Sequence, residues 1–260
     1  MKTRNINKIF NVVQDLGYKN LIVGGCSFTY NNSDHDACTW PYYLRDYGNF
    51  QNVYDFSMVG GGNTHTFNAV IYGIEKNISI LQDSLIIIQI AGHDRDDYII
   101  DPSEINDYPF TYFYDSSSMV GITGGESISN FKRKDPIKEI KSMKNLENRS
   151  IENFIKISAL NSYFLSLGAS YMFFEYRDYA LPGRDKNFDL KKYLPPVIVE
   201  KYQSIVTELP MNFYKFCVFN DLLEDDDFHP SPEGHRLWTL EHLLPHLAIH
   251  HKNKLQLPAD

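Results

Sequence analysis

The sequence has 260 residues, of which 43% are hydrophobic and 22% are charged. These proportions are ordinary for a folded globular protein and exclude a disordered or collagen-like chain. The formal net charge of −8 at pH 7 argues against nucleic acid and against an anionic membrane surface as partners, because both attract basic proteins.

The first ninety residues alternate between helical and strand patterns. Helical spacing of apolar residues predicts a helix over 5–17, and a short apolar run predicts a buried strand that ends in glycines. In chain order the predicted elements are a helix at 5–17, a strand at 20–25, a helix at 40–47, a strand at 52–58, a helix at about 64–75 and a strand at 84–90. Strands that are apolar on both faces and alternate with helices indicate a parallel sheet covered by helices.

The pattern breaks at residues 98–147, which are rich in Asp, Ser, Gly, Tyr and Lys. A stretch of that length with weak periodicity is typical of a lid, a binding loop or a small subdomain. The alternation then returns with a helix near 149–167, a strand at 171–176, a helix near 195–208 and a short strand at 213–219. A last helix begins after Ser231, a good N-cap residue, and is expected to end near Leu244 because Pro245 follows.

Cysteine usage and the absence of targeting patterns bear on the compartment. Three cysteines, Cys26, Cys38 and Cys217, make neither a disulfide framework nor a paired zinc motif. The first residues lack the apolar segment of a signal peptide, and no apolar run reaches 18 residues. We therefore expect a cytoplasmic or virion-associated protein without a metal or cofactor. Composition does not indicate the oligomeric state.

Chemistry-bearing residues follow three of the predicted strands. Ser27 lies in a glycine turn after the first strand, Gly60 to Gly62 follow the second, and Gly92-His93-Asp94-Arg95 follows the third. The carboxyl ends of strands in an open parallel sheet form the ligand crevice, so these turns should converge. Near the C-terminus, Asp226 precedes His229 by three residues. A carboxylate at that spacing can orient an imidazole that activates a serine hydroxyl.

This ordered set resembles the SGNH (GDSL-like) hydrolase superfamily, over about residues 20 to 246. The resemblance implies a flavodoxin-like three-layer α/β/α sandwich with a central parallel sheet. It also implies that Ser27 is the nucleophile, His229 the base and Asp226 the carboxylate that orients it. The oxyanion hole would then comprise the N–H groups of Ser27 and Gly60, with His93 at the position of a third donor.

Two positions depart from the family pattern. Cys26 replaces the Asp that usually precedes the nucleophile, and His93 replaces an Asn whose amide donates to the oxyanion. A histidine can donate one N–H if its tautomer suits, and it can equally be a buried structural residue. Asn63 is a candidate substitute donor, and Asn63, Asp94 and Arg95 are candidate substrate contacts.

The predicted function is a serine esterase that hydrolyses small acyl esters, with O-acetyl groups on carbohydrate as the implied substrate. The alternatives are an O-acyltransferase and a non-catalytic carbohydrate-binding or structural module on the same fold. We expect a single domain over 1–260, with residues 98–147 as an insert or lid. That insert carries an aromatic cluster, which forms either a small satellite core or a surface that stacks on sugars: Tyr108, Phe110, Tyr112, Phe113 and Tyr114.

Overall fold

The computed structural model describes residues 13–30, 39–58, 61–92, 96–100, 111–113, 120–124, 146–177, 194–224 and 229–251. Its centre is a four-stranded parallel sheet in the order β2-β1-β3-β7. The strands are β1 (Asn20–Gly24), β2 (Asn52–Asp55), β3 (Ser84–Ile90) and β7 (Ser170–Glu175). Beyond β7, a single parallel bridge joins Phe173 to Val206. The order is that of flavodoxin-like folds, in which the switch point lies between β1 and β3.

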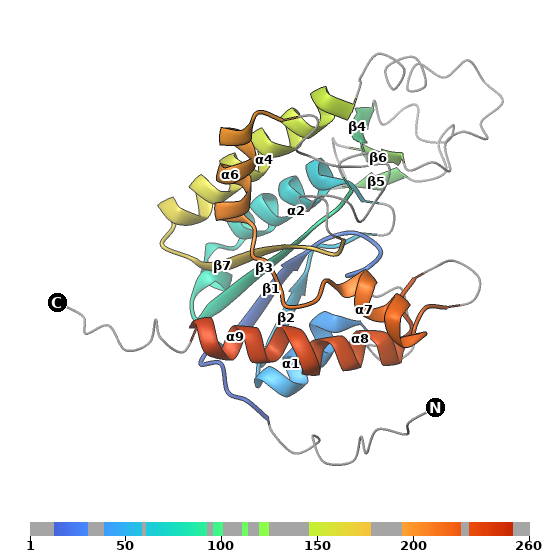
Figure 1. Ribbon diagram of the computed structural model, residues 1–260. Coiled ribbons are helices and arrows are strands. Elements are labelled where there is room, and N and C mark those ends of the chain that lie inside the picture. The colour runs from blue at the N-terminus through green and yellow to red at the C-terminus, as the bar shows by residue number, and fades with distance from the viewer. Residues whose placement is uncertain are drawn as a thin grey trace.

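Helices cover both faces of this sheet (Figure 1). One layer contains α2 (Asn63–Lys76), α4 (Leu146–Ser166) and α6 (Pro196–Ile205), with a 3-10 turn, η2 (Ile78–Leu81), after α2. The other layer contains α1 (Trp40–Gly48), α7 (Phe213–Asn220), α8 (Pro232–Trp238), the π-helical turn η5 (Thr239–Leu243) and α9 (Leu244–His251). The predicted three-layer α/β/α architecture is confirmed.

The core lies on both faces of β3, whose seven residues are all buried. This explains its nearly continuous apolar sequence, because helices cover a parallel sheet on each side. Gly24 ends β1 and lies against side chains of α2. A Cβ atom there would lie 2.8 Å from Val70 Cγ2 and 2.9 Å from Thr66 Cγ2, so a larger residue would push α2 off the sheet.

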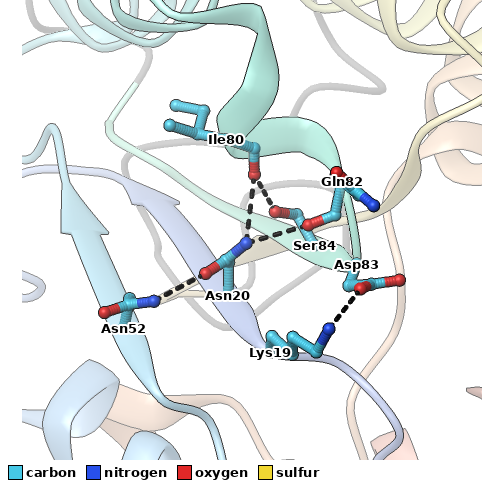
Figure 2. A network of polar contacts seen from close by, with 7 residues as sticks. All are labelled: Lys19, Asn20, Asn52, Ile80, Gln82, Asp83 and Ser84. Atoms are coloured by element: carbon cyan, nitrogen blue, oxygen red, sulfur yellow. Dashed lines mark hydrogen bonds and ion pairs between the residues drawn. The ribbon is translucent and has the colours of Figure 1, made fainter.

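Polar side chains tie the amino ends of the strands together in what we call the strand-start network (Figure 2). Its members are Lys19, Asn20, Asn52, Ile80, Gln82, Asp83 and Ser84. The Asn20 amide donates to the Gln82 carbonyl at 2.8 Å and accepts from the Asn52 amide at 2.9 Å. The Ser84 hydroxyl donates to the Ile80 carbonyl. The network therefore fixes where β1, β2 and β3 begin.

The predicted strand at 213–219 is wrong, because this segment is helix α7. Its run of aromatic and β-branched residues favours a strand locally. Two features select the helix instead. Asn212 caps it by accepting from the Lys215 N–H at 2.8 Å. Phe213, Phe216 and Cys217 are its buried residues, and their spacing is that of one helical face. Tertiary packing has overridden the local preference.

The last helix also differs from its predicted end. Ser231 caps α8 as expected, accepting from the Gly234 N–H at 3.2 Å. The chain does not stop near Leu244 but passes through η5 into α9, with Pro245 as the second residue of α9. A π turn shifts the hydrogen-bond ladder by one residue. The proline, which lacks an N–H, is thereby accommodated without ending the helix.

Residues 13–17 are not helical, and Gly17 has φ 79°, a conformation that glycine adopts at little cost. The rest of the predicted 5–17 helix lies outside the described residues.

The 98–147 region contributes to a three-stranded antiparallel sheet in the order β4-β6-β5. Its strands are β4 (Asp96–Ile100), β5 (Thr111–Phe113) and β6 (Val120–Gly124). Tyr112 and Phe113 of the predicted aromatic cluster lie in β5, and the cluster's other members lie outside the described residues.

Candidate active site

Ser27 lies in a tight turn directly after β1, at the carboxyl edge of the sheet. The carbonyl of Cys26 accepts from the N–H groups of Thr29 and Tyr30, at 2.8 and 3.0 Å. A Cβ atom on Gly25 would overlap the Thr29 hydroxyl, so the turn requires glycine there. Ser27 itself is partly exposed. The turn thus presents a hydroxyl at the edge of the sheet where ligands bind in open α/β folds.

His229 meets this serine although 202 positions separate them in the sequence. Its Nε2 atom lies 2.7 Å from the Ser27 Oγ atom, a normal hydrogen-bond distance. With the ring proton on Nδ1, Nε2 can accept the serine hydroxyl proton. The Nδ1 atom is buried, and it is the atom at which an orienting carboxylate would act.

The backbone on both sides of His229 is fixed by an antiparallel pairing. The Glu224 N–H donates to the His229 carbonyl at 2.7 Å, and the Ser231 N–H donates to the Leu222 carbonyl at 2.8 Å. The His229 ring also contacts the buried Phe28 ring, with centroids 4.9 Å apart. The imidazole is therefore held from its backbone and from one ring face.

A chain of buried hydrogen bonds supports the serine turn from below, and we call it the Gln89 network. The Gln89 amide nitrogen donates to Cys26 Sγ at 3.0 Å, and its oxygen accepts from the Thr29 hydroxyl at 2.6 Å. The Trp40 indole donates to the Thr29 oxygen at 3.2 Å, and the Trp40 backbone N–H donates to Nδ1 of His235 at 3.1 Å. Each of these donors faces an acceptor, so the network joins the serine turn to β3, α1 and α8.

Burial, with a smaller contribution from the charge of nearby His229, lowers the pKa of His235 to about 3. His235 is therefore neutral at physiological pH. Because Nδ1 of His235 accepts from Trp40, its proton is on Nε2. A neutral His235 adds no positive charge beside His229, so it does not oppose the protonation of His229.

Asn63 has a different role from the one that the sequence suggested. Its side chain is buried and pairs with the backbone of Ala91: Nδ2 donates to the Ala91 carbonyl at 3.1 Å, and Oδ1 accepts from the Ala91 N–H at 2.8 Å. The second amide hydrogen is donated to Asn153 at 3.0 Å. With both hydrogens committed, Asn63 has none for an oxyanion or substrate. It joins the start of α2 to the end of β3.

The segment after β2 is braced against the serine turn. β2 ends at Asp55, three residues before the predicted end, because Asp55 accepts from the N–H of Ser57, at 2.9 Å, and from its hydroxyl. The Met58 N–H then donates to the Gly25 carbonyl at 3.1 Å. Burial raises the pKa of Asp55 to about 6, against the lowering effect of the two Ser57 hydrogen bonds.

Several predicted site residues lie outside the described residues: Gly60, His93, Asp94, Arg95 and Asp226. Their roles stay predictions. Within the described ranges, no group of three or more His, Cys, Asp or Glu side chains is arranged to hold a metal ion. None of the helices in those ranges has the length and apolarity needed to cross a membrane.

Sequence reasoning missed the Gln89 network and the contact of Phe28 with His229. One signal was available, because Gln89 is the only polar residue between Leu85 and Ile90 in the most apolar strand. A buried amide needs hydrogen-bond partners, which marks this position as one that anchors a neighbour. No pattern could have identified Phe28, since its contact depends on a residue two hundred positions away.

Comparisons with known proteins agree with this architecture. No protein-family model matches the sequence, and no curated protein matches it. Among solved structures, the chain is similar to the psychrotrophic esterase EstA from Pseudoalteromonas sp., inhibited by monoethylphosphonate, with a TM-score of 0.50 and 10% identity over 92% of this chain and 100% of that one. A protein from Desulfitobacterium hafniense DCB-2, assigned to the G-D-S-L family of lipolytic proteins, matches with a TM-score of 0.43 and 13% identity over 85% of this chain and 95% of that one.

Proposed function

We propose that this chain, which has the fold of the SGNH (GDSL-like) hydrolases, is a serine esterase that acts on small acyl esters. The observation that carries the proposal is the 2.7 Å contact between Ser27 Oγ and His229 Nε2. A serine hydroxyl is a weak nucleophile until a base accepts its proton. Here such a base lies at the edge of the sheet where ligands bind in this class of fold.

In the first half of the reaction, Ser27 Oγ attacks the ester carbonyl carbon while its proton passes to His229 Nε2. The carbonyl π electrons move onto the oxygen, which becomes an oxyanion. When this intermediate collapses, the bond to the alcohol oxygen breaks and His229 protonates the leaving alcohol. Water then attacks the acyl-enzyme in the same way, releasing the acid and restoring both residues.

The oxyanion needs hydrogen-bond donors that are already in place. In the part of the chain that the structure describes, the N–H of Ser27 donates to no other group, so it is available for this role. We propose Gly60 and His93 as the other donors, and Asn63 is not among them. Removal of one such donor typically costs about 100- to 1000-fold in rate.

Two further residues act on His229 in this proposal. Asp226 would accept the Nδ1–H of His229, which keeps the lone pair on Nε2 and stabilises the imidazolium that forms. His235, held neutral by burial, spares that imidazolium the repulsion of a second positive charge. Acetyl esters on carbohydrate are the substrate that we propose on the strength of the family resemblance, with cleavage by hydrolysis.

The test is a fluorophosphonate probe, which forms a covalent adduct only with an activated serine. We expect peptide mass spectrometry to place the adduct on Ser27 of the wild type, and we expect it to be lost in Ser27→Ala and in His229→Ala. The same variants should lose about 10³-fold or more of the activity on 4-nitrophenyl acetate. Ser231→Ala is the matched control: that serine caps a helix, so the variant should keep the adduct on Ser27. A folded wild type without an adduct on Ser27 would refute the proposal.

A further inference from the structure

Arg177 follows β7 at the carboxyl edge of the sheet, the same edge that presents Ser27. β7 pairs in parallel with β3, which pairs in parallel with β1. The segments that follow these three strands therefore emerge side by side. Arg177 is two residues beyond the end of β7 and is only partly exposed.

A continuous set of rings joins Arg177 to the catalytic pair, and we call it the aromatic wall: Phe28, Tyr176 and Tyr214. The Phe28 ring contacts His229, with centroids 4.9 Å apart, and it contacts Tyr176 at 4.3 Å and Tyr214 at 6.2 Å. The guanidinium carbon of Arg177 lies 3.8 Å from the Tyr214 ring centroid and 5.5 Å from that of Tyr176. The wall thus begins at the histidine and ends at a cation.

The contact of the Arg177 guanidinium with the Tyr214 ring does not itself use an N–H group as a hydrogen-bond donor. A guanidinium that lies over an aromatic face directs its donors outward in its own plane. One of them, Nε of Arg177, is buried and has no hydrogen-bond partner within the described residues. A buried donor of this kind is costly unless a ligand accepts from it. Stacking on Tyr214 accounts for the position of the charge but not for this donor.

Planar anions fit such a donor set. A carboxylate can accept two parallel N–H bonds from one guanidinium. The position of Arg177 relative to His229 decides which part of the substrate carries the anion. In the proposed reaction His229 gives its proton to the leaving alcohol, so the alcohol lies on the His229 side, where the aromatic wall begins.

Resting on the proposed esterase function, we infer that Arg177 binds a carboxylate on the alcohol part of the ester. The substrate class is then the acyl ester of a hydroxylated carboxylic acid, such as an O-acetylated uronic acid unit of a glycan. The partly exposed Tyr214 ring at the end of the aromatic wall would pack against the body of the alcohol, and Arg177 would select for its acid group. Arg177 is therefore a specificity-determining residue.

The experiment compares 4-acetoxybenzoate, whose alcohol part carries a carboxylate, with its methyl ester, which has the same reacting bond. We expect Arg177→Gln to lower kcat/KM for the acid by about 10- to 100-fold, the effect of losing a charged hydrogen bond. For the methyl ester, kcat/KM for release of the acetyl group should change less than about threefold. Arg177→Lys keeps the charge without the planar fork and should lie between wild type and Arg177→Gln.

Arg45 provides the matched control, because its guanidinium also lies over a tyrosine ring, 5.5 Å from the centroid of Tyr42, and it pairs with Asp46 at 2.7 Å. Arg45→Gln removes the same charge outside the site and should leave the ratio of the two substrates unchanged. If Arg177→Gln lowers kcat/KM equally for the two substrates, or lowers it for neither, the inference is overturned and Arg177 has only a stacking role.

A binding assay separates this inference from the proposed function. Calorimetric titration of Ser27→Ala protein with 4-acetoxybenzoate measures binding without turnover, and the double variant with Arg177→Gln should bind about tenfold or more weakly. If wild type hydrolyses neither ester, the esterase proposal fails and this titration alone decides the role of Arg177. Equal affinity in the two proteins, or no binding to Ser27→Ala, overturns it.

Discussion

The two ends of the central sheet use polar residues in opposite ways. At the amino ends, the strand-start network pairs side chains with nearby backbone carbonyls and with each other, partly in contact with solvent (Figure 2). At the carboxyl ends, Ser27 and His229 come from opposite ends of the sequence and bond to each other. One edge aligns strands, whereas the other brings together groups that can react.

The difference extends to what lies beneath each edge. At the carboxyl edge, the buried hydrogen-bonded side chains of the Gln89 network lie beneath the turn that carries Ser27. At the amino edge, the polar side chains bond directly to the turn before β3. A reactive hydroxyl has to be held in position by its neighbours while its own hydrogen bond to the base remains possible. Changes at the two edges should therefore affect activity and stability differently.

The largest effect is expected for Gln89→Leu, which removes the centre of the Gln89 network. The Thr29 hydroxyl loses its acceptor and Cys26 Sγ loses its donor. We expect the free energy of unfolding in urea to fall by about 2–3 kcal/mol. Because the serine turn loses its support, kcat should fall by about tenfold or more.

Asn153→Leu is the control for this prediction, since it also removes a buried amide, one that bonds to Asn63 rather than to the serine turn. It should destabilise the protein while changing kcat less than Gln89→Leu does. Should Gln89→Leu lower stability with kcat intact, the network supports the fold but not the reactive serine.

Acid should destabilise the carboxyl edge through His235. Its pKa is about 3 in the folded protein and near 6.5 when unfolded, so the unfolded chain binds one more proton between these values. The contribution of neutral His235 to the free energy of unfolding is therefore complete above about pH 6.5. It is lost as the pH falls, by at most about 1.4 kcal/mol per pH unit. His235→Asn retains an acceptor for the Trp40 N–H and lacks the titration.

The measurement is urea unfolding of wild type and His235→Asn at pH 7.0, 6.0 and 5.0. We expect the variant to be less stable at pH 7.0 and the difference to shrink by about 1–2 kcal/mol at pH 5.0. Asp55, whose pKa is raised to about 6, makes the folded state more stable as the pH falls. This contribution is the same in both proteins and cancels in their difference. Parallel curves would show that His235 does not titrate as its burial requires.

The same contrast explains what the sequence could predict. Local patterns located the strands of the sheet, helices α1, α2, α4 and α6, and the start of α8, because burial on two faces and helical spacing are properties of short segments. The order of motifs and the family resemblance predicted that Ser27 and His229 meet, and their side chains lie 2.7 Å apart; their catalytic roles stay predictions. Helix α7 was missed although its Asn212 cap is a local signal, because the aromatic run favours a strand. The role of Asn63 was not predictable, since it depends on partners distant in sequence. For Asn63, those partners are Ala91 and Asn153.

The smallest effect is expected at the amino edge, for Lys19→Ala. Lys19 Nζ lies 3.0 Å from Asp83, with the two side chains 62% and 46% exposed, and exposed pairs contribute about 0–1 kcal/mol. The substitution belongs on Lys19, because Asp83 has φ 55° and replacing it would add backbone strain. Unfolding free energy should fall by less than about 0.5 kcal/mol, and esterase kcat should not change. A loss of activity would mean that the amino edge also controls the site, which would remove the distinction between the two edges.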